Sequence, residues 1–420
     1  MKKTGKIISI FLALAVVAGV VYLFVSNSLK EKTQSGDELA GEKCGDEAYW
    51  TFDGSKLFIG GKGKMYEYDP TGELMEITEE GENCVPWRSL RNKVESIEIG
   101  NGITNIANWA FEGFTSLVSV DISGTVESIG RDAFESCSSL SDVKLNNGLK
   151  EIGPWAFVYC TSLEKIEFPD SLKIIDRNAF GECGLKEITI PATLEVLERD
   201  VFEGCVNLEN VVFPKGFTAV SRGTFAGCTK LKKIDLPETL EGIGRAAFDG
   251  CSGLSEINIP DSVTEIGMGA FEGCTELNSI KMSKNITYID EAAFENTGYY
   301  NNESNWEKGV LYIDEYLIGA DNISGDYYIK SGTKSVARGA FDGCNNLTSI
   351  TVPESVQSFA YNPLGECGNL KKVVFLGKEV EFDDVFSTNE SELTFCCYTD
   401  STAYSYAQEK GIKCVLMDGQ

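Results

Sequence analysis

The sequence predicts a repeat solenoid, because one pattern of apolar residues returns along most of the chain. A phenylalanine recurs every 23 residues, with a single step of 22: Phe111, Phe134, Phe157, Phe180, Phe202, Phe225, Phe248, Phe271 and Phe294. A cysteine follows most of them by three residues, and a short run of alternating apolar and polar residues precedes each one. A unit of this length cannot bury its own apolar face, so the copies are expected to stack around a shared core.

One repeat, from Leu163 to Cys183, shows the elements expected in each unit. The run LEKIEF alternates apolar and polar residues, which indicates a short strand with one buried face. Pro169 ends that strand, because it cannot donate to a ladder. LKII (172–175) predicts a second short extended segment, and the spacing in NAFGEC (178–183) predicts a single helical or 3₁₀ turn against the core.

The pattern breaks once, between Phe294 and Phe341, where the step is 47 residues. The sequence therefore predicts one irregular repeat at about 295–330. Within it, GVLYIDEYLIGA (309–320) predicts a hairpin with Asp314 and Glu315 at its turn.

At these residues the chain resembles the BspA-type leucine-rich repeat family, whose units read roughly I-x-I-P-x-x-V-x-x-I-G-x-x-A-F-x-x-C-x-x-L. The resemblance covers residues 94–375 and implies a β-rich leucine-rich repeat solenoid with short helical or 3₁₀ turns. It also implies a β-rich N-terminal cap at 44–93 and a C-terminal cap at 376–420. In the C-terminal cap, STAYSYAQEKGIKCV (401–415) resembles a closing helix and strand.

The N-terminal residues predict a membrane anchor. Residues 7–25 carry no charge and would extend about 28 Å as a helix, close to the thickness of a bilayer core. Three lysines in the tail 1–6 place the N-terminus in the cytoplasm and the solenoid outside the cell, beyond a polar stalk at 26–43. A cleaved signal peptide, which would make the protein secreted, is the alternative.

Composition excludes several functions. The formal charge of −27 disfavours nucleic acid, and the absence of histidine removes the commonest general base and metal ligand. We therefore expect no catalytic residues, cofactor or metal. The alternative is an enzyme, or an enzyme subunit, that acts on cell-wall or host polymers through a pair of its many carboxylates.

Nine of the 14 cysteines share one position in the repeat and are expected to be small apolar core residues. They are Cys137, Cys160, Cys183, Cys205, Cys228, Cys251, Cys274, Cys344 and Cys367. Five others lie outside the pattern. Cys44 could pair with Cys84, and Cys396 or Cys397 could pair with Cys414, although sequence alone does not fix the geometry.

Two surfaces are candidates for binding. The outward rows of the first strand alternate in charge and carry no aromatic residue, so that face is expected to be partly self-paired. Aromatic residues concentrate instead in the irregular repeat, where they either fill the core or form a ligand surface. The candidate binding residues are Tyr299, Tyr300, Trp306, Tyr312 and Tyr316.

These observations favour a surface-displayed, non-catalytic interaction protein. The resemblance implies adhesion to a host matrix protein or to a partner on another bacterial surface. A simple spacer would differ only in having no partner.

Overall fold

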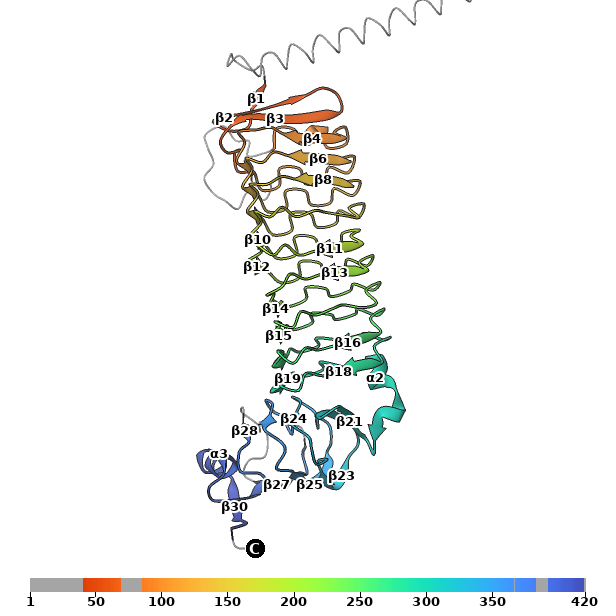
Figure 1. Cartoon of the computed structure of the whole chain (residues 1–420), viewed down its shortest axis with the longest axis vertical. Helices are drawn as coiled ribbons and strands as arrows, with labels where there is room; N and C mark the ends of the chain where they lie inside the picture. Colours follow the sequence, from red (N-terminus) through yellow and green to blue (C-terminus); the bar gives the residue numbers. More distant parts are fainter. Residues whose placement is uncertain (1–40, 69–84, 366, 383–391, 419–420) are drawn as a thin grey trace, which may run out of the picture.

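The computed structural model describes residues 41–68, 85–365, 367–382 and 392–418, which form an elongated stack with a bent C-terminal arm (Figure 1). The predicted membrane anchor at 7–25 and most of the predicted stalk lie outside these ranges. Inside them, no helix has the length and apolar character needed to cross a bilayer.

The stack begins with an antiparallel hairpin. It consists of β1 (Glu42–Lys43), β2 (Glu47–Phe52) and β3 (Lys56–Lys62), with a turn at Asp53 and Gly54 between β2 and β3. β3 then pairs in parallel with the first strand of the array, so the hairpin covers an edge that would otherwise be open. After the 3₁₀ helix η1 (Arg88–Leu90), the fully buried Trp87 lies face to face with Phe111, at 5.5 Å between ring centres.

Each repeat of the array contributes one rung, and the rungs build two rows of parallel strands. The first-strand row contains β4 (Ser96–Ile99), β6 (Ser119–Ile122), β8 (Asp142–Leu145), β11 (Glu187–Thr189), β13 (Asn210–Val212), β16 (Glu256–Asn258) and β18 (Ser279–Lys281). The second-strand row contains β5 (Asn105–Ile106), β7 (Ser128–Ile129), β9 (Glu151–Ile152), β10 (Ile174–Ile175), β12 (Val196–Leu197), β14 (Ala219–Val220), β15 (Gly242–Ile243), β17 (Glu265–Ile266) and β19 (Tyr288–Ile289). Equivalent residues of neighbouring rungs pair in register, as with Val120 and Val143.

The core is a continuous stack of phenylalanine rings. From Phe111 to Phe294 every ring packs on the next, with ring centres 5.1–5.9 Å apart. The widest spacing, 5.9 Å, separates Phe180 from Phe202 and coincides with the single step of 22 residues. In the rung of Phe180, Gly184 lies so close to the preceding rung that a Cβ there would be 2.2 Å from Thr161 O.

The predicted helical or 3₁₀ turn around each Ala-Phe pair is wrong. Described residues 94–294 contain no helix, and the residue two before each phenylalanine has a left-handed backbone, as in Trp109 (φ 54°) and Trp155 (φ 56°). This conformation turns alternate N–H groups toward the next rung, so that Phe111 N donates to Ala133 O at 2.8 Å. The hydrogen bonds between rungs offset the steric cost of the left-handed residues.

The irregular repeat forms a joint at which the stack bends. It contains α2 (Gly298–Asn301), η2 (Glu303–Asn305), β20 (Trp306–Glu307), and the predicted hairpin of β21 (Val310–Ile313) and β22 (Tyr316–Ala320). Figure 1 shows α2 and β21 on the side of the first-strand row. On the opposite side, β19 meets the arm directly through Arg338 N, which donates to Ile289 O at 2.9 Å. Because the extra chain lies on one side only, the stack turns toward the second-strand side.

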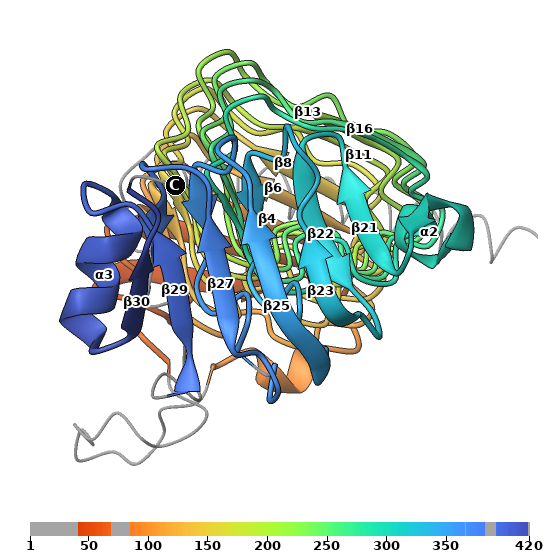
Figure 2. The ribbon, with the colours of Figure 1, turned by 90° about the horizontal axis from the view of Figure 1, so that it is seen from below.

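The C-terminal arm repeats the two-row architecture along a new direction. β23 (Ser324–Tyr328), β25 (Asn346–Val352), β27 (Lys372–Phe375), β29 (Thr394–Cys397) and β30 (Lys413–Leu416) lie side by side in one parallel sheet (Figure 2). β22 heads the other row, which continues with β24 (Ser335–Val336), β26 (Ser358–Phe359) and β28 (Glu381–Phe382). The closing helix α3 (Thr402–Lys410) starts at Ser401, whose hydroxyl accepts from Tyr404 N, and leads into β30 as predicted.

Candidate functional site

The predicted aromatic cluster forms the joint, and its polar groups bond to the protein itself. Trp306 Nε1 donates to Tyr300 O at 2.7 Å, and the two rings meet edge to face at 5.1 Å. Tyr299 Oη donates to Tyr312 O at 3.0 Å. Tyr316 Oη reaches back into the last regular rung and donates to Ser283 O at 2.8 Å. The cluster therefore ties the hairpin to the array.

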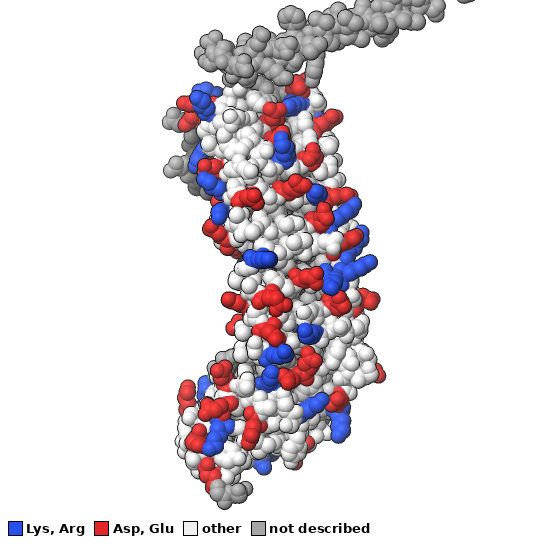
Figure 3. Space-filling view, viewed as in Figure 1, with Lys and Arg blue, Asp and Glu red and all other residues white. Residues whose placement is uncertain are grey.

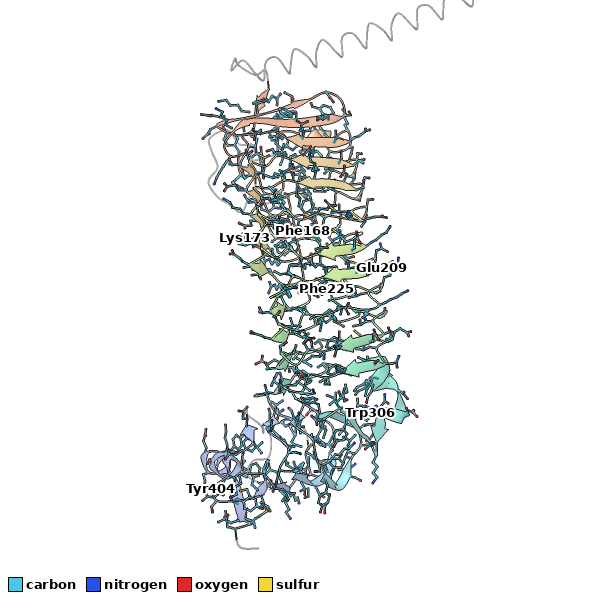
Figure 4. All side chains as sticks on the ribbon, in the orientation of Figure 1. Phe168, Lys173, Glu209, Phe225, Trp306 and Tyr404 are labelled. Atoms are coloured by element: carbon cyan, nitrogen blue, oxygen red, sulfur yellow. The ribbon has the colours of Figure 1, made fainter. Side chains whose placement is uncertain are left out.

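Burial differs among the five candidate residues. Tyr316 is 1% exposed and Tyr312 is 9% exposed, so both side chains fill the core of the joint, which is one of the two roles that the sequence left open. Burial also raises the pKa of Tyr316 to about 12. Tyr299, Tyr300 and Trp306 are half-buried, and their role in binding stays a prediction (Figure 4 labels Trp306).

The cysteine ladder lies inside the core, as predicted. Each described repeat cysteine is buried, and its thiol points at a backbone carbonyl of the rung before, as in Cys228 Sγ to Phe202 O at 3.4 Å. Burial raises the pKa of Cys205 and Cys274 to about 12, which makes these thiols poor nucleophiles.

The cysteines outside the ladder show no disulfide among the described residues. Cys44, Cys396, Cys397 and Cys414 are unpaired thiols. Cys84, the suggested partner of Cys44, lies outside the described residues.

The first-strand face pairs many of its charges internally, as the alternating rows predict. Lys144 bonds to Asp121 at 3.1 Å and Lys186 to Glu164 at 2.6 Å, each across neighbouring rungs. In Figure 3 acidic and basic side chains are interleaved over the visible face. Exposed pairs of this kind stabilise little individually.

A hollow lies at the inner side of the bend, and we call it the elbow groove. Its volume is about 800 Å³, within the range of ligand pockets. The array contributes Glu265, Thr287 and Tyr288, the second-strand row of the arm contributes Ser358, Phe359, Val380, Glu381 and Phe382, and α3 contributes Thr402, Ser405, Tyr406 and Glu409. The groove thus combines aromatic rings, hydroxyl groups and three carboxylates.

The floor of the groove is fixed by packing. Phe359 is fully buried, and the rings of Phe382 and Tyr406 stack at 5.0 Å between their centres. Above this floor, Glu265, Glu381 and Glu409 are exposed. Sequence reasoning missed the groove because its walls come from segments 70 or more residues apart in the sequence and meet only through the bend. The available signal was a change of residue type in the second-strand row, where Tyr288 follows Gly242 and Glu265 at the same repeat position.

A carboxylate with an unusual environment lies elsewhere. Asp132 is 9% exposed, and burial followed by the charge of Glu135 raises its pKa to about 7. Asp132 occupies a left-handed turn position (φ 53°) and does not line the elbow groove. No group of three or more potential metal-ligating side chains that could hold an ion occurs in the part of the chain that the structure describes.

The fold and this distribution of chemistry define a β-solenoid repeat protein of about 14 turns. A profile of the BspA type leucine rich repeat region matches residues 90–209, 195–324 and 321–403, with six copies. Because the matches span most of the chain, the protein belongs to this family.

Solved structures of leucine-rich repeat proteins show similarity at low identity. One from Bacteroides ovatus is 22% identical, with 89% of this chain and 76% of that one covered and a TM-score of 0.45. One from Eubacterium ventriosum is 19% identical, with 79% and 77% covered and a TM-score of 0.44. A leucine rich cell surface protein from Faecalibacterium prausnitzii is 18% identical, with 85% and 97% covered and a TM-score of 0.34. No curated protein matches the sequence.

Proposed function

We propose that this protein is a surface-displayed, non-catalytic adhesion protein that binds a host matrix protein or a protein of another bacterial surface. The observation that carries the proposal is the elbow groove, a concave site with aromatic rings at the end of the stack remote from β1 (Figure 1). Aromatic side chains in a concave site are frequent anchors of protein interfaces. Family membership adds an expectation of protein binding, by analogy of fold alone.

The proposed location rests on the first 25 residues. The uncharged segment 7–25 would anchor the chain, and the preceding lysines would keep its N-terminus in the cytoplasm. The solenoid would then project from the cell, and the groove would lie far from the membrane. Cleavage of the segment would instead release the same binding protein.

The enzymatic alternative needs a carboxylate that stays protonated near neutral pH, which burial usually provides. Glu265, Glu381 and Glu409 are all exposed, so none of them has the buried setting that such a general acid uses. The raised pKa of Asp132 belongs to a turn in the wall of the array. These features favour binding over catalysis.

Adherence of cells that display the full chain tests this proposal. Such cells should bind immobilised matrix proteins, or neighbouring bacteria, more strongly than cells without the chain, and purified full chain should compete. No difference in adherence across both kinds of surface would refute adhesion. Release of soluble fragments from cell-wall polymers, abolished by Glu381→Gln, would establish the enzyme instead.

A further inference from the structure

The elbow groove gathers three carboxylates in a lining that holds no cationic side chain. Along the second-strand side of the array, Glu127 pairs with Lys150 at 3.0 Å and Glu195 with Lys173 at 2.9 Å. None of the ion pairs formed within the described residues includes Glu265, Glu381 or Glu409, and the groove lining contains no lysine or arginine. The groove therefore presents three uncompensated carboxylates.

A basic residue lies next to the lining. Lys410 Nζ is 5.8 Å from the ring centre of Tyr406, on α3. Its single positive charge does not balance three carboxylates, so the lining keeps an excess of negative charge. Because low-dielectric walls focus the field of like charges in a cleft, this excess should attract cations into the groove.

The aromatic residues of the groove select among cationic ligands. Tyr288, Phe382 and Tyr406 are half-buried and line the same hollow. Rings next to carboxylates favour an ammonium or guanidinium group on an apolar stem, because the stem packs on the ring and the cation interacts with both the ring and the carboxylate. Small metal cations would use the carboxylates alone, whereas lysine and arginine side chains would use both.

We propose that the elbow groove binds an extended, lysine- or arginine-bearing segment of the partner protein. This inference rests on the proposed adhesive function and specifies the chemistry of the partner. It also gives the bend a role: the hairpin and aromatic cluster on one side of the joint bring together the two walls of a binding site on the other side.

The probe for this inference is a terminally blocked, fluorescein-labelled decapeptide that alternates lysine and serine, with an alternating glutamate and serine peptide as its control. Purified full chain should bind the lysine peptide and not the glutamate peptide, by fluorescence anisotropy at low ionic strength. The triple change Glu265→Gln, Glu381→Gln and Glu409→Gln should weaken binding by about tenfold or more and flatten its salt dependence.

A matched control keeps the same change in net charge. Glu209, Glu238 and Glu276 are exposed, form no ion pair within the described residues and do not line the groove (Figure 4 labels Glu209). The corresponding triple Glu→Gln change should leave affinity within about twofold. Equal losses in the two triple variants would mean that only the net charge attracts the peptide, which would overturn the proposal.

A second variant tests the groove even if the triple Glu→Gln variant fails to fold. Ser405 is exposed on α3 and lines the groove, so Ser405→Lys adds a cation to the site without removing a core group. It should weaken peptide binding about tenfold and leave the melting temperature unchanged. Unaltered affinity in this variant, or tight binding of a neutral oligosaccharide that Ser405→Lys abolishes, would contradict a basic peptide as the ligand.

The outcomes separate this inference from the proposed function. If cells that display the groove triple variant still adhere like wild type, adhesion stands and the groove proposal fails. If wild-type cells adhere to nothing while the peptide binds in the groove, the site stands and adhesion fails.

Discussion

The regular array and the joint use aromatic side chains in opposite ways. In the array, one phenylalanine per rung stacks on identical neighbours, and the rungs continue the stack in one direction. In the joint, tyrosine and tryptophan side chains bond to unlike partners, such as Tyr316 to Ser283, and the stack turns there. Repetition thus builds length, whereas the single departure from repetition creates curvature and, with it, a concave site.

The largest expected effect breaks the regular half of this comparison. Phe225 is fully buried and stacks on Phe202 and Phe248 at 5.7 and 5.6 Å. Phe225→Ala should lower the free energy of unfolding by about 3–5 kcal/mol, since it leaves a cavity in a continuous core. Chemical denaturation measures this, with Cys228→Ser as a milder change in the same rung. A wild-type midpoint for Phe225→Ala would show that the ring stack is not the core.

The second prediction concerns Asp132, which occupies the left-handed turn position of its rung. Asp132 has a pKa raised to about 7, so between the pKa of the unfolded chain and pH 7 the folded protein holds a proton that the unfolded chain has lost. Stability should therefore fall as pH rises through this window, by up to about 1.4 kcal/mol per pH unit, and level off above it.

Asp132→Asn should remove that decline. Asparagine tolerates the left-handed backbone and occupies the equivalent position at Asn178 (φ 53°). Melting temperatures of wild type and variant between pH 4 and 8 provide the measurement. Parallel curves for the two proteins would mean that Asp132 titrates normally.

The smallest expected effect sharpens the comparison at the joint. Tyr316→Phe removes the hydroxyl that bonds Ser283 O and should cost about 1–2 kcal/mol, because a buried carbonyl loses its donor. Tyr328→Phe is the matched control, since Tyr328 is 70% exposed. Equal stability of both variants, measured by denaturation, would remove the argument that the hydroxyl ties the hairpin to the array.

The sequence predicted the repeats, the irregular repeat and the closing helix, and it missed the contacts that depend on the bend. The spacing of Phe225 and its equivalents specified the rungs, the core and the position of the irregular repeat, because each rung contacts mainly its neighbours. The helical turn was wrong since the spacing of Ala179, Phe180 and Cys183 does not distinguish a helix from consecutive turns whose N–H groups bond to the next rung. Glu265 and Glu409 could not be associated from sequence, because their proximity depends on the direction of the bend.

The hydrogen bonds between rungs have a mechanical consequence. They run along the long axis, as from Phe111 N to Ala133 O. A force that pulls the two ends of the stack apart therefore acts parallel to these bonds and can break those of one rung at a time. Rungs should then detach one after another, each releasing about 80 Å of chain at 3.3–3.6 Å per residue. A stack held at one end and attached at the other would lengthen stepwise under load, and would thereby limit the force that reaches whatever is bound at its tip.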